Sequence, residues 1–100
     1  SKRGEKIVKE FIKSRSESTI AKISHKIDLL QNYGPNLGMP HAKKITHNLY
    51  ELRVRGTDEI RIIYSFVNNK IYLLHGFNKK TQEIPRREIT IAESRLKDLT

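Results

Sequence analysis

The sequence predicts an α+β fold in which two helices precede an antiparallel sheet of three or more strands, and one helix follows it. Apolar residues recur at helical spacing before residue 34 and again after residue 84. Between residues 50 and 77 they follow instead the period of two that is typical of strands. A chain of 100 residues is short enough to form one core, so we expect residues 1–100 to make one domain.

Two amphipathic segments predict a helical hairpin at the N-terminus. Residues 5–13 have one apolar side, with lysines opposite, and the polar stretch 14–18 interrupts the pattern. A second stripe of apolar residues then runs to Gly34-Pro35, a pair that ends helices. The stripe consists of Ile20, Ile23, Ile27 and Leu30.

The sheet is predicted to begin near residue 50. Residues 36–47 contain glycine and proline and lack periodicity, so they predict a loop that holds at most one short strand. Apolar and charged residues then alternate through residue 55. The alternation predicts a half-buried strand with Arg53 and Arg55 on one face.

Two further strands are predicted after the turn 56–59. In residues 60–66 the alternation separates Arg61 from the face that carries Tyr64. Asn68-Asn69 tolerates positive φ and predicts a tight turn into residues 70–77. That last strand is apolar on both faces, so we expect it to be central in the sheet.

The final helix is expected from Pro85, because proline suits the first helical position. Its apolar residues fall at helical spacing and should face the core. They are Ile89, Ala92, Leu96 and Leu99.

Charge composition favours a polyanionic partner. The chain has 20 Lys and Arg against 11 Asp and Glu, a net charge of +9, and the excess lies before residue 83. It has no cysteine, so thiolate metal sites and cysteine nucleophiles are excluded. We expect neither metal nor cofactor.

No apolar run reaches the ~20 residues of a membrane span and no signal peptide is evident, so a cytoplasmic location is expected.

Three motifs indicate a family. The run LHGFNKKTQEIP, residues 74–85, ends an apolar strand in two lysines, and it follows LYELR at residues 49–53 and IRIIY at residues 60–64. With these motifs the chain resembles the RelE/HigB-like toxins of type II toxin–antitoxin systems, in particular the phage-derived HigB-like subgroup. The resemblance implies a RelE-like small domain. Relatives usually open with one further strand, which is missing or cut short here, so one sheet edge is expected to lack that neighbour.

The resemblance also implies an activity and its partners. RelE-like toxins are metal-independent, ribosome-dependent endoribonucleases (mRNA interferases) that inhibit translation. A cognate antitoxin of the helix-turn-helix type would neutralise the toxin, and operator DNA would be bound only through that antitoxin. The expected partners are therefore the antitoxin, the ribosome and mRNA, with no membrane.

Basic residues are the candidates for the chemistry. RNA is cut without metal when a 2′-hydroxyl attacks the adjacent phosphate, and cationic groups stabilise the charge that develops. The resemblance assigns catalysis to Arg61, Lys80 and Arg53. RNA binding is predicted for Arg55, Lys79, Lys43, Lys44, His75 and Tyr64. The tyrosine or acidic and histidine cluster that several relatives carry near the C-terminus is absent, so His75 and His47 are the candidate general acids or bases.

Simpler interpretations remain open at this point. A row of strand arginines is more often a solvated surface, and a strand histidine such as His75 more often donates to a backbone carbonyl. Tyr64 fits a core aromatic. The alternative function is a non-catalytic basic module of the same fold that binds RNA, DNA or protein, and a third is a nuclease that acts on free RNA.

Overall fold

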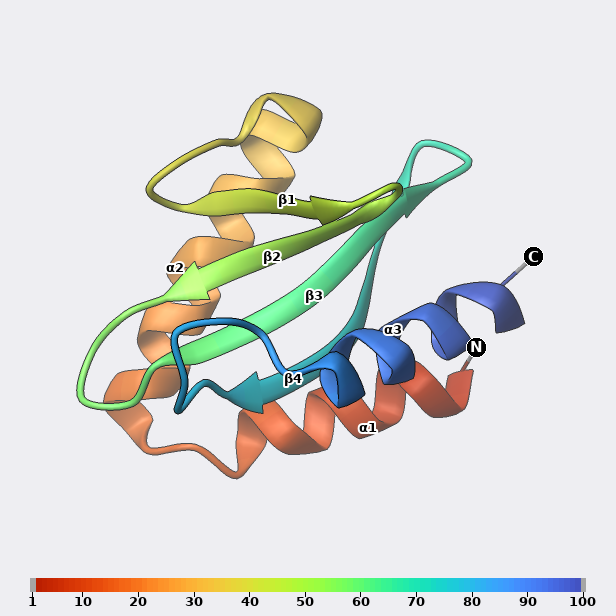
Figure 1. Ribbon diagram of the computed structural model, residues 1–100. Coiled ribbons are helices and arrows are strands. Elements are labelled where there is room, and N and C mark those ends of the chain that lie inside the picture. The colour runs from red at the N-terminus through yellow and green to blue at the C-terminus, as the bar shows by residue number, and fades with distance from the viewer. Residues whose placement is uncertain (1, 100) are drawn as a thin grey trace.

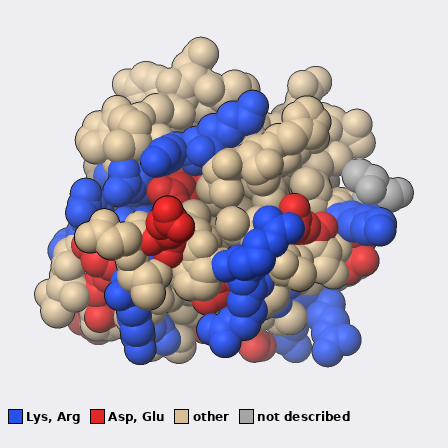
Figure 2. All heavy atoms as spheres, in the orientation of Figure 1, with Lys and Arg blue, Asp and Glu red and all other residues tan. Residues whose placement is uncertain are grey.

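The computed structural model describes residues 2–99, and it confirms the α+β class (Figure 1). Two helices come first, then a short 3₁₀ turn, a four-stranded antiparallel sheet and a last helix. Along the chain these are α1 (Lys2–Lys13), α2 (Glu17–Tyr33), η1 (Gly34–Asn36), β1 (Ala42–Thr46), β2 (Leu49–Val54), β3 (Ile60–Val67), β4 (Lys70–Asn78) and α3 (Arg86–Asp98). No helix within these bounds is long and apolar enough to cross a membrane. Lysine and arginine side chains form several patches on the visible face, with acidic side chains between them (Figure 2).

The strands lie in the order β1-β2-β3-β4, so β4 is at an edge of the sheet and the prediction that it is central was wrong. Its two apolar faces have another cause, because β4 contacts both α1 and α3. Helices that cover both faces make an edge strand as apolar as a central one. The short strand allowed for within residues 36–47 is β1, which pairs with β2 through the turn at His47-Asn48.

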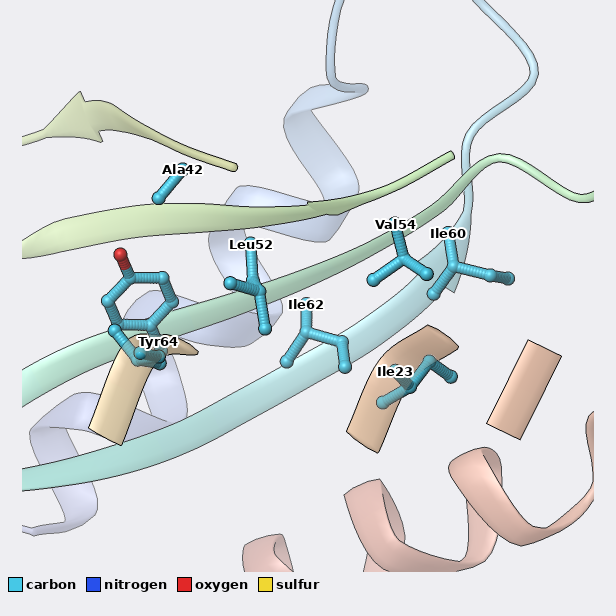
Figure 3. Packing of buried hydrophobic residues seen from close by; sticks show 8 residues of the cluster. Ile23, Ala42, Leu52, Val54, Ile60, Ile62 and Tyr64 are labelled. Atoms are coloured by element: carbon cyan, nitrogen blue, oxygen red, sulfur yellow. The ribbon is translucent and has the colours of Figure 1, made fainter. Parts of the chain in front are cut away.

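The sheet is a middle layer with a separate apolar cluster on each side. Toward α2, side chains of β2 and β3 such as Leu52 and Ile62 meet Ile23 (Figure 3). Toward α3, Ile63 and Phe77 lie in the second cluster, together with Leu49, Leu74 and Ala92. Alternation along β2 and β3 divides their apolar residues between the clusters, as a period of two requires. In β4 a bulge shifts the period, so Leu74 and Phe77 lie in the same cluster.

The turns follow the local signals. Ser16 caps α2 by accepting a hydrogen bond from the Thr19 N–H, and Gly34 ends that helix at φ 53°. Asn68 and Asn69 have φ values of 51° and 64°, which confirms the tight turn between β3 and β4.

Gly76 of β4 allows α1 to approach the sheet. A Cβ atom at this position would lie 2.6 Å from Cδ2 of the Phe11 ring. Only glycine leaves room for that ring, so residue 76 sets the distance between α1 and β4.

Candidate nucleic-acid interface

A groove lined mainly by basic side chains lies where β2 and β4 end and β3 begins, beside the loop that leads to α3. It has a volume of about 510 Å³, and we call it the basic groove. It brings together five residues predicted from the sequence, namely Arg53, Arg55, Arg61, Lys79 and Lys80. Glu59, Thr81 and Gln82 complete its lining. Antiparallel pairing explains the convergence, since Arg53 and Arg61 are direct cross-strand partners and Lys79 follows the end of β4.

Arg61 forms the floor of the basic groove and is only 2% exposed. Its Nη1 donates to the Ile60 carbonyl at 2.9 Å, and its Nη2 donates to Oε1 of Glu59 at 3.1 Å. Its Nε has no hydrogen-bond partner among the residues that the structure describes. The guanidinium is therefore held in one orientation.

Glu59 joins two of these arginines. Besides Arg61, its Oε1 lies 3.4 Å from Nε of Arg55. Burial opposes ionisation of this carboxyl, but the hydrogen bond from Arg61, the charges of Arg61 and Arg55 and the Gly56 backbone together lower the pKa of Glu59. From the sequence, Glu59 is predicted only as part of a turn. Its position two residues before Arg61, on the same face of an extended chain, could have indicated the pair.

A second carboxylate, Glu51, lies beside Arg53. Oε1 of Glu51 is 3.6 Å from Nε of Arg53, an ion pair too long for a hydrogen bond. Arg53 also directs Nη1 to the sulfur of Met39, at 3.2 Å. Glu51 is 4% exposed, and it is not among the site residues predicted from the sequence.

The lysines are less constrained than the arginines. The backbone N–H of Lys79 donates to the Glu59 carbonyl at 2.6 Å, which fixes the start of the loop, while Lys80 is exposed. Lys43 and Lys44 are exposed on β1 and line a neighbouring hollow that also includes Lys79. Figure 2 shows basic and acidic side chains close together in this part of the molecule.

Two comparisons with known proteins indicate the family of this chain. Residues 10–97 match the model of the family described as phage-derived protein Gp49-like. The chain belongs to this family. The Gp49-like chain is also similar to the Mycobacterium tuberculosis protein named "Putative toxin HigB3", with 36% identity over 75 residues. The match covers 69% of this chain and 65% of the length of that relative. The similarity to HigB-like toxins inferred from the three motifs is confirmed.

His75 of this Gp49-like protein lies outside the basic groove. Its Nε2 is 2.8 Å from Oε1 of Glu88, and its Nδ1 is 3.3 Å from Nη1 of Arg95. Because arginine can only donate, Nδ1 accepts and Nε2–H donates to the carboxylate. The partner of His75 is thus a carboxylate of α3, where the simpler interpretation expected a backbone carbonyl. The same Arg95 donates to the Leu74 carbonyl at 2.7 Å, beside a bulge between β3 and β4.

Tyr64 is separated from the groove by the sheet itself. It is 1% exposed and packs in the cluster that faces α2, with its ring stacked on Tyr50 at 5.5 Å between centroids. Burial raises the pKa of Tyr64 to about 12, and the neighbouring Tyr50 adds to the shift.

His47 lies in the β1–β2 turn, beside a different hollow that includes Asn68. Between residues 2 and 99, no three His, Cys, Asp or Glu side chains gather closely enough to hold a metal ion.

Proposed function

We propose that this Gp49-like protein is a type II toxin that cleaves mRNA on the ribosome and thereby inhibits translation. The observation that carries the proposal is the basic groove, where five cations from three strand ends and one loop surround one carboxylate in the described part of the chain. Such a surface suits an RNA backbone. The name of the M. tuberculosis relative supports a toxin.

The chemistry assigned to the groove is electrostatic. Attack of a 2′-hydroxyl on the adjacent phosphate increases the negative charge on the phosphate oxygens in the transition state. Arg61, already oriented, and Lys80, on an exposed loop, would stabilise that charge, with Arg53 beside Arg61. Catalytic groups that are oriented before the reaction need no reorganisation during it.

Glu59 would act as a placeholder for the phosphate. In the free protein it pairs with both Arg55 and Arg61 and offsets one of their two positive charges, and an entering phosphate would take over these contacts. The lowered pKa of Glu59 makes this carboxylate a weak proton acceptor, so we assign it to holding the arginines.

The remaining basic residues would hold the RNA and the ribosome. Arg55 and Lys79 line the groove and would contact the RNA backbone. Lys43 and Lys44, together with the lysines of α1, would add affinity for ribosomal RNA.

A cognate antitoxin would cover the basic groove with an acidic segment and would carry the DNA-binding helix-turn-helix. The place of action would be the cytoplasm, where ribosomes are.

Primer extension on mRNA in a reconstituted translation reaction, with and without ribosomes, tests the proposal. We expect cuts only when ribosomes are present, and Lys80→Ala should reduce them on the order of 100-fold by removing one charge from the transition state. Lys70→Ala is the matched control, because Lys70 is also exposed but is the first residue of β4, next to the Asn68-Asn69 turn and outside the groove. Absence of cuts by the unsubstituted chain would refute the nuclease, and cuts in naked RNA would indicate a nuclease that acts on free RNA.

A non-catalytic binding module is the second candidate. One observation favours it, since no imidazole or phenol is among the groove-lining residues within the described range. Arg61→Ala separates the two functions. A nuclease should lose growth arrest and keep ribosome association, whereas a binding module should lose both together.

A further inference from the structure

A second hollow lies beside the basic groove, and we call it the side pocket. It has a volume of about 260 Å³ and lies between β1, β2 and the start of α3. Lys79 and Gln82 line both the side pocket and the basic groove. A chain that follows the groove could therefore place one of its groups in the side pocket.

The side pocket contains a carboxylate that lacks hydrogen bonds. Glu51, which forms part of its wall, is 96% buried, and its Oε2 has no hydrogen-bond partner among residues 2–99. In the described part of the chain, its Oε1 has only the 3.6 Å ion pair with Arg53. A buried carboxylate without hydrogen-bond donors destabilises the folded protein. An unpaired carboxylate oxygen in a pocket wall therefore indicates that a ligand supplies the donor.

The other residues that line the side pocket indicate which kind of ligand would donate this hydrogen bond. Ile45, Ile84 and Ile89 supply apolar walls suited to a flat ring, and Lys43 and Lys79 supply positive charge suited to a phosphate. Lys44 is a third lysine in the lining, and the lysines disfavour a metal cation at Glu51. Glu83 is a second carboxylate in the lining, and the two carboxylates disfavour a bare anion. A nucleotide combines the features that remain, namely an apolar ring face, N–H donors on the ring edge and a phosphate.

We propose that the side pocket binds one base of the RNA and that Glu51 selects a base with an exocyclic amino group over uracil. An ionised carboxylate only accepts hydrogen bonds, so it pairs with the amino group of cytosine, adenine or guanine. Uracil presents carbonyl oxygens on both sides of its N3–H, and Glu51 repels them. The inference rests on the proposed function only in taking RNA as the ligand of the basic groove.

The test measures binding rather than cleavage. Tetraribonucleotides of cytidine, adenosine and uridine are titrated into the ¹⁵N-labelled protein at low salt and followed by NMR. We expect the cytidine tetramer to bind on the order of tenfold more tightly than the uridine tetramer, because the two pyrimidines differ at the group that Glu51 contacts. Equal binding of uridine and both amino-bearing tetramers, or no binding at millimolar concentration, overturns the proposal.

Two changes locate the preference at Glu51. Glu51→Gln should bring the cytidine and uridine tetramers within about twofold of each other, because an amide can also donate to a carbonyl. Glu10→Gln is the matched control, a carboxylate-to-amide change on exposed α1, and should keep the preference. If Glu51→Gln retains the preference, the proposal fails. Should that variant not fold, a tetramer of N4,N4-dimethylcytidine tests the same contact, since it lacks the amino hydrogens and should bind no better than uridine.

The outcome is independent of the nuclease assay. A preference for cytidine without any cuts in primer extension leaves the side pocket standing and refutes the nuclease. Ribosome-dependent cuts without any preference in binding support the nuclease and refute base selection by the side pocket.

Discussion

Glu59 and Glu51 each share a strand face with an arginine two residues away, and each reduces the free positive charge beside the basic groove. Glu59 is paired with Arg55 and Arg61, and Glu51 lies against Arg53. These pairs differ in burial, and burial decides their energetic weight. Arg61 is 2% exposed, whereas the side chain of Arg55 is 64% exposed.

Removing these two arginines should therefore have unequal effects on stability. Arg61→Ala should lower the free energy of unfolding by about 2–3 kcal/mol, because it leaves a cavity and a carboxylate without its buried partner. Arg55→Ala removes a contact to the same carboxylate from an exposed position and should cost less than about 0.5 kcal/mol. Urea unfolding of both variants measures the difference. Equal losses would show that burial of Arg61 contributes nothing.

Glu59 should make stability depend on pH. Its pKa is lower in the folded protein than the ordinary value of 4.5, so its contribution is present above pH 4.5 and is lost as the pH falls through the folded value. Glu59→Gln should cost about 0.5–1 kcal/mol at pH 7, a figure discounted for the exposed third of the side chain, and less at pH 3. Unfolding midpoints of both proteins at the two pH values test this. A constant difference would exclude a role for the charge.

Among the helices and strands, the packing of α1 on β4 depends most directly on one residue. Phe11 lies over Gly76, and α1 covers a strand that would otherwise expose an apolar face at the edge of the sheet. The contact depends on the absence of a side chain at residue 76.

Gly76→Ala should thus destabilise the fold by about 1–3 kcal/mol, because the new methyl group would overlap the Phe11 ring. Gly38→Ala serves as its control, since a Cβ there meets nothing within 4 Å, and it should change stability by less than about 0.5 kcal/mol. Thermal unfolding followed by circular dichroism compares the two. If Gly76→Ala is as stable as Gly38→Ala, the distance between α1 and β4 is not set by residue 76.

The net charge of +9 acts at the scale of the whole molecule. It should attract RNA from any direction, but the groove and its loop determine where the phosphates are held. Binding should weaken steeply with salt.

Substituting the loop lysines should change that salt dependence. Lys79→Ala and Lys80→Ala should each reduce the slope of log K against log salt for single-stranded RNA by about 0.7, the value for one phosphate contact. Lys70→Ala, at the start of β4, should leave the slope unchanged. Fluorescence anisotropy over a series of salt concentrations provides the measurement. An equal effect of all three substitutions would mean that RNA binds without a defined site.

Much of the fold and of the groove was predictable from the sequence. The helices, the three longer strands, the Asn68-Asn69 turn and the ending at Gly34 depend on residues close together in the chain. The convergence of Arg53 and Arg61 follows from antiparallel pairing around one turn. These are local properties, because backbone preference and the direction of alternate side chains are set within a few residues.

What the sequence determined by itself was therefore the order of elements, the faces of the strands, the excess of positive charge and the family motifs. Only the tertiary structure decided that β4 is an edge strand, that His75 is joined to Glu88 of α3 and that Arg61 is buried against Glu59. It also decided that Oε2 of Glu51 has no hydrogen-bond partner within the described residues. These features depend on which distant segments cover a side chain and remove its water. Periodicity along one strand carries no information about that covering.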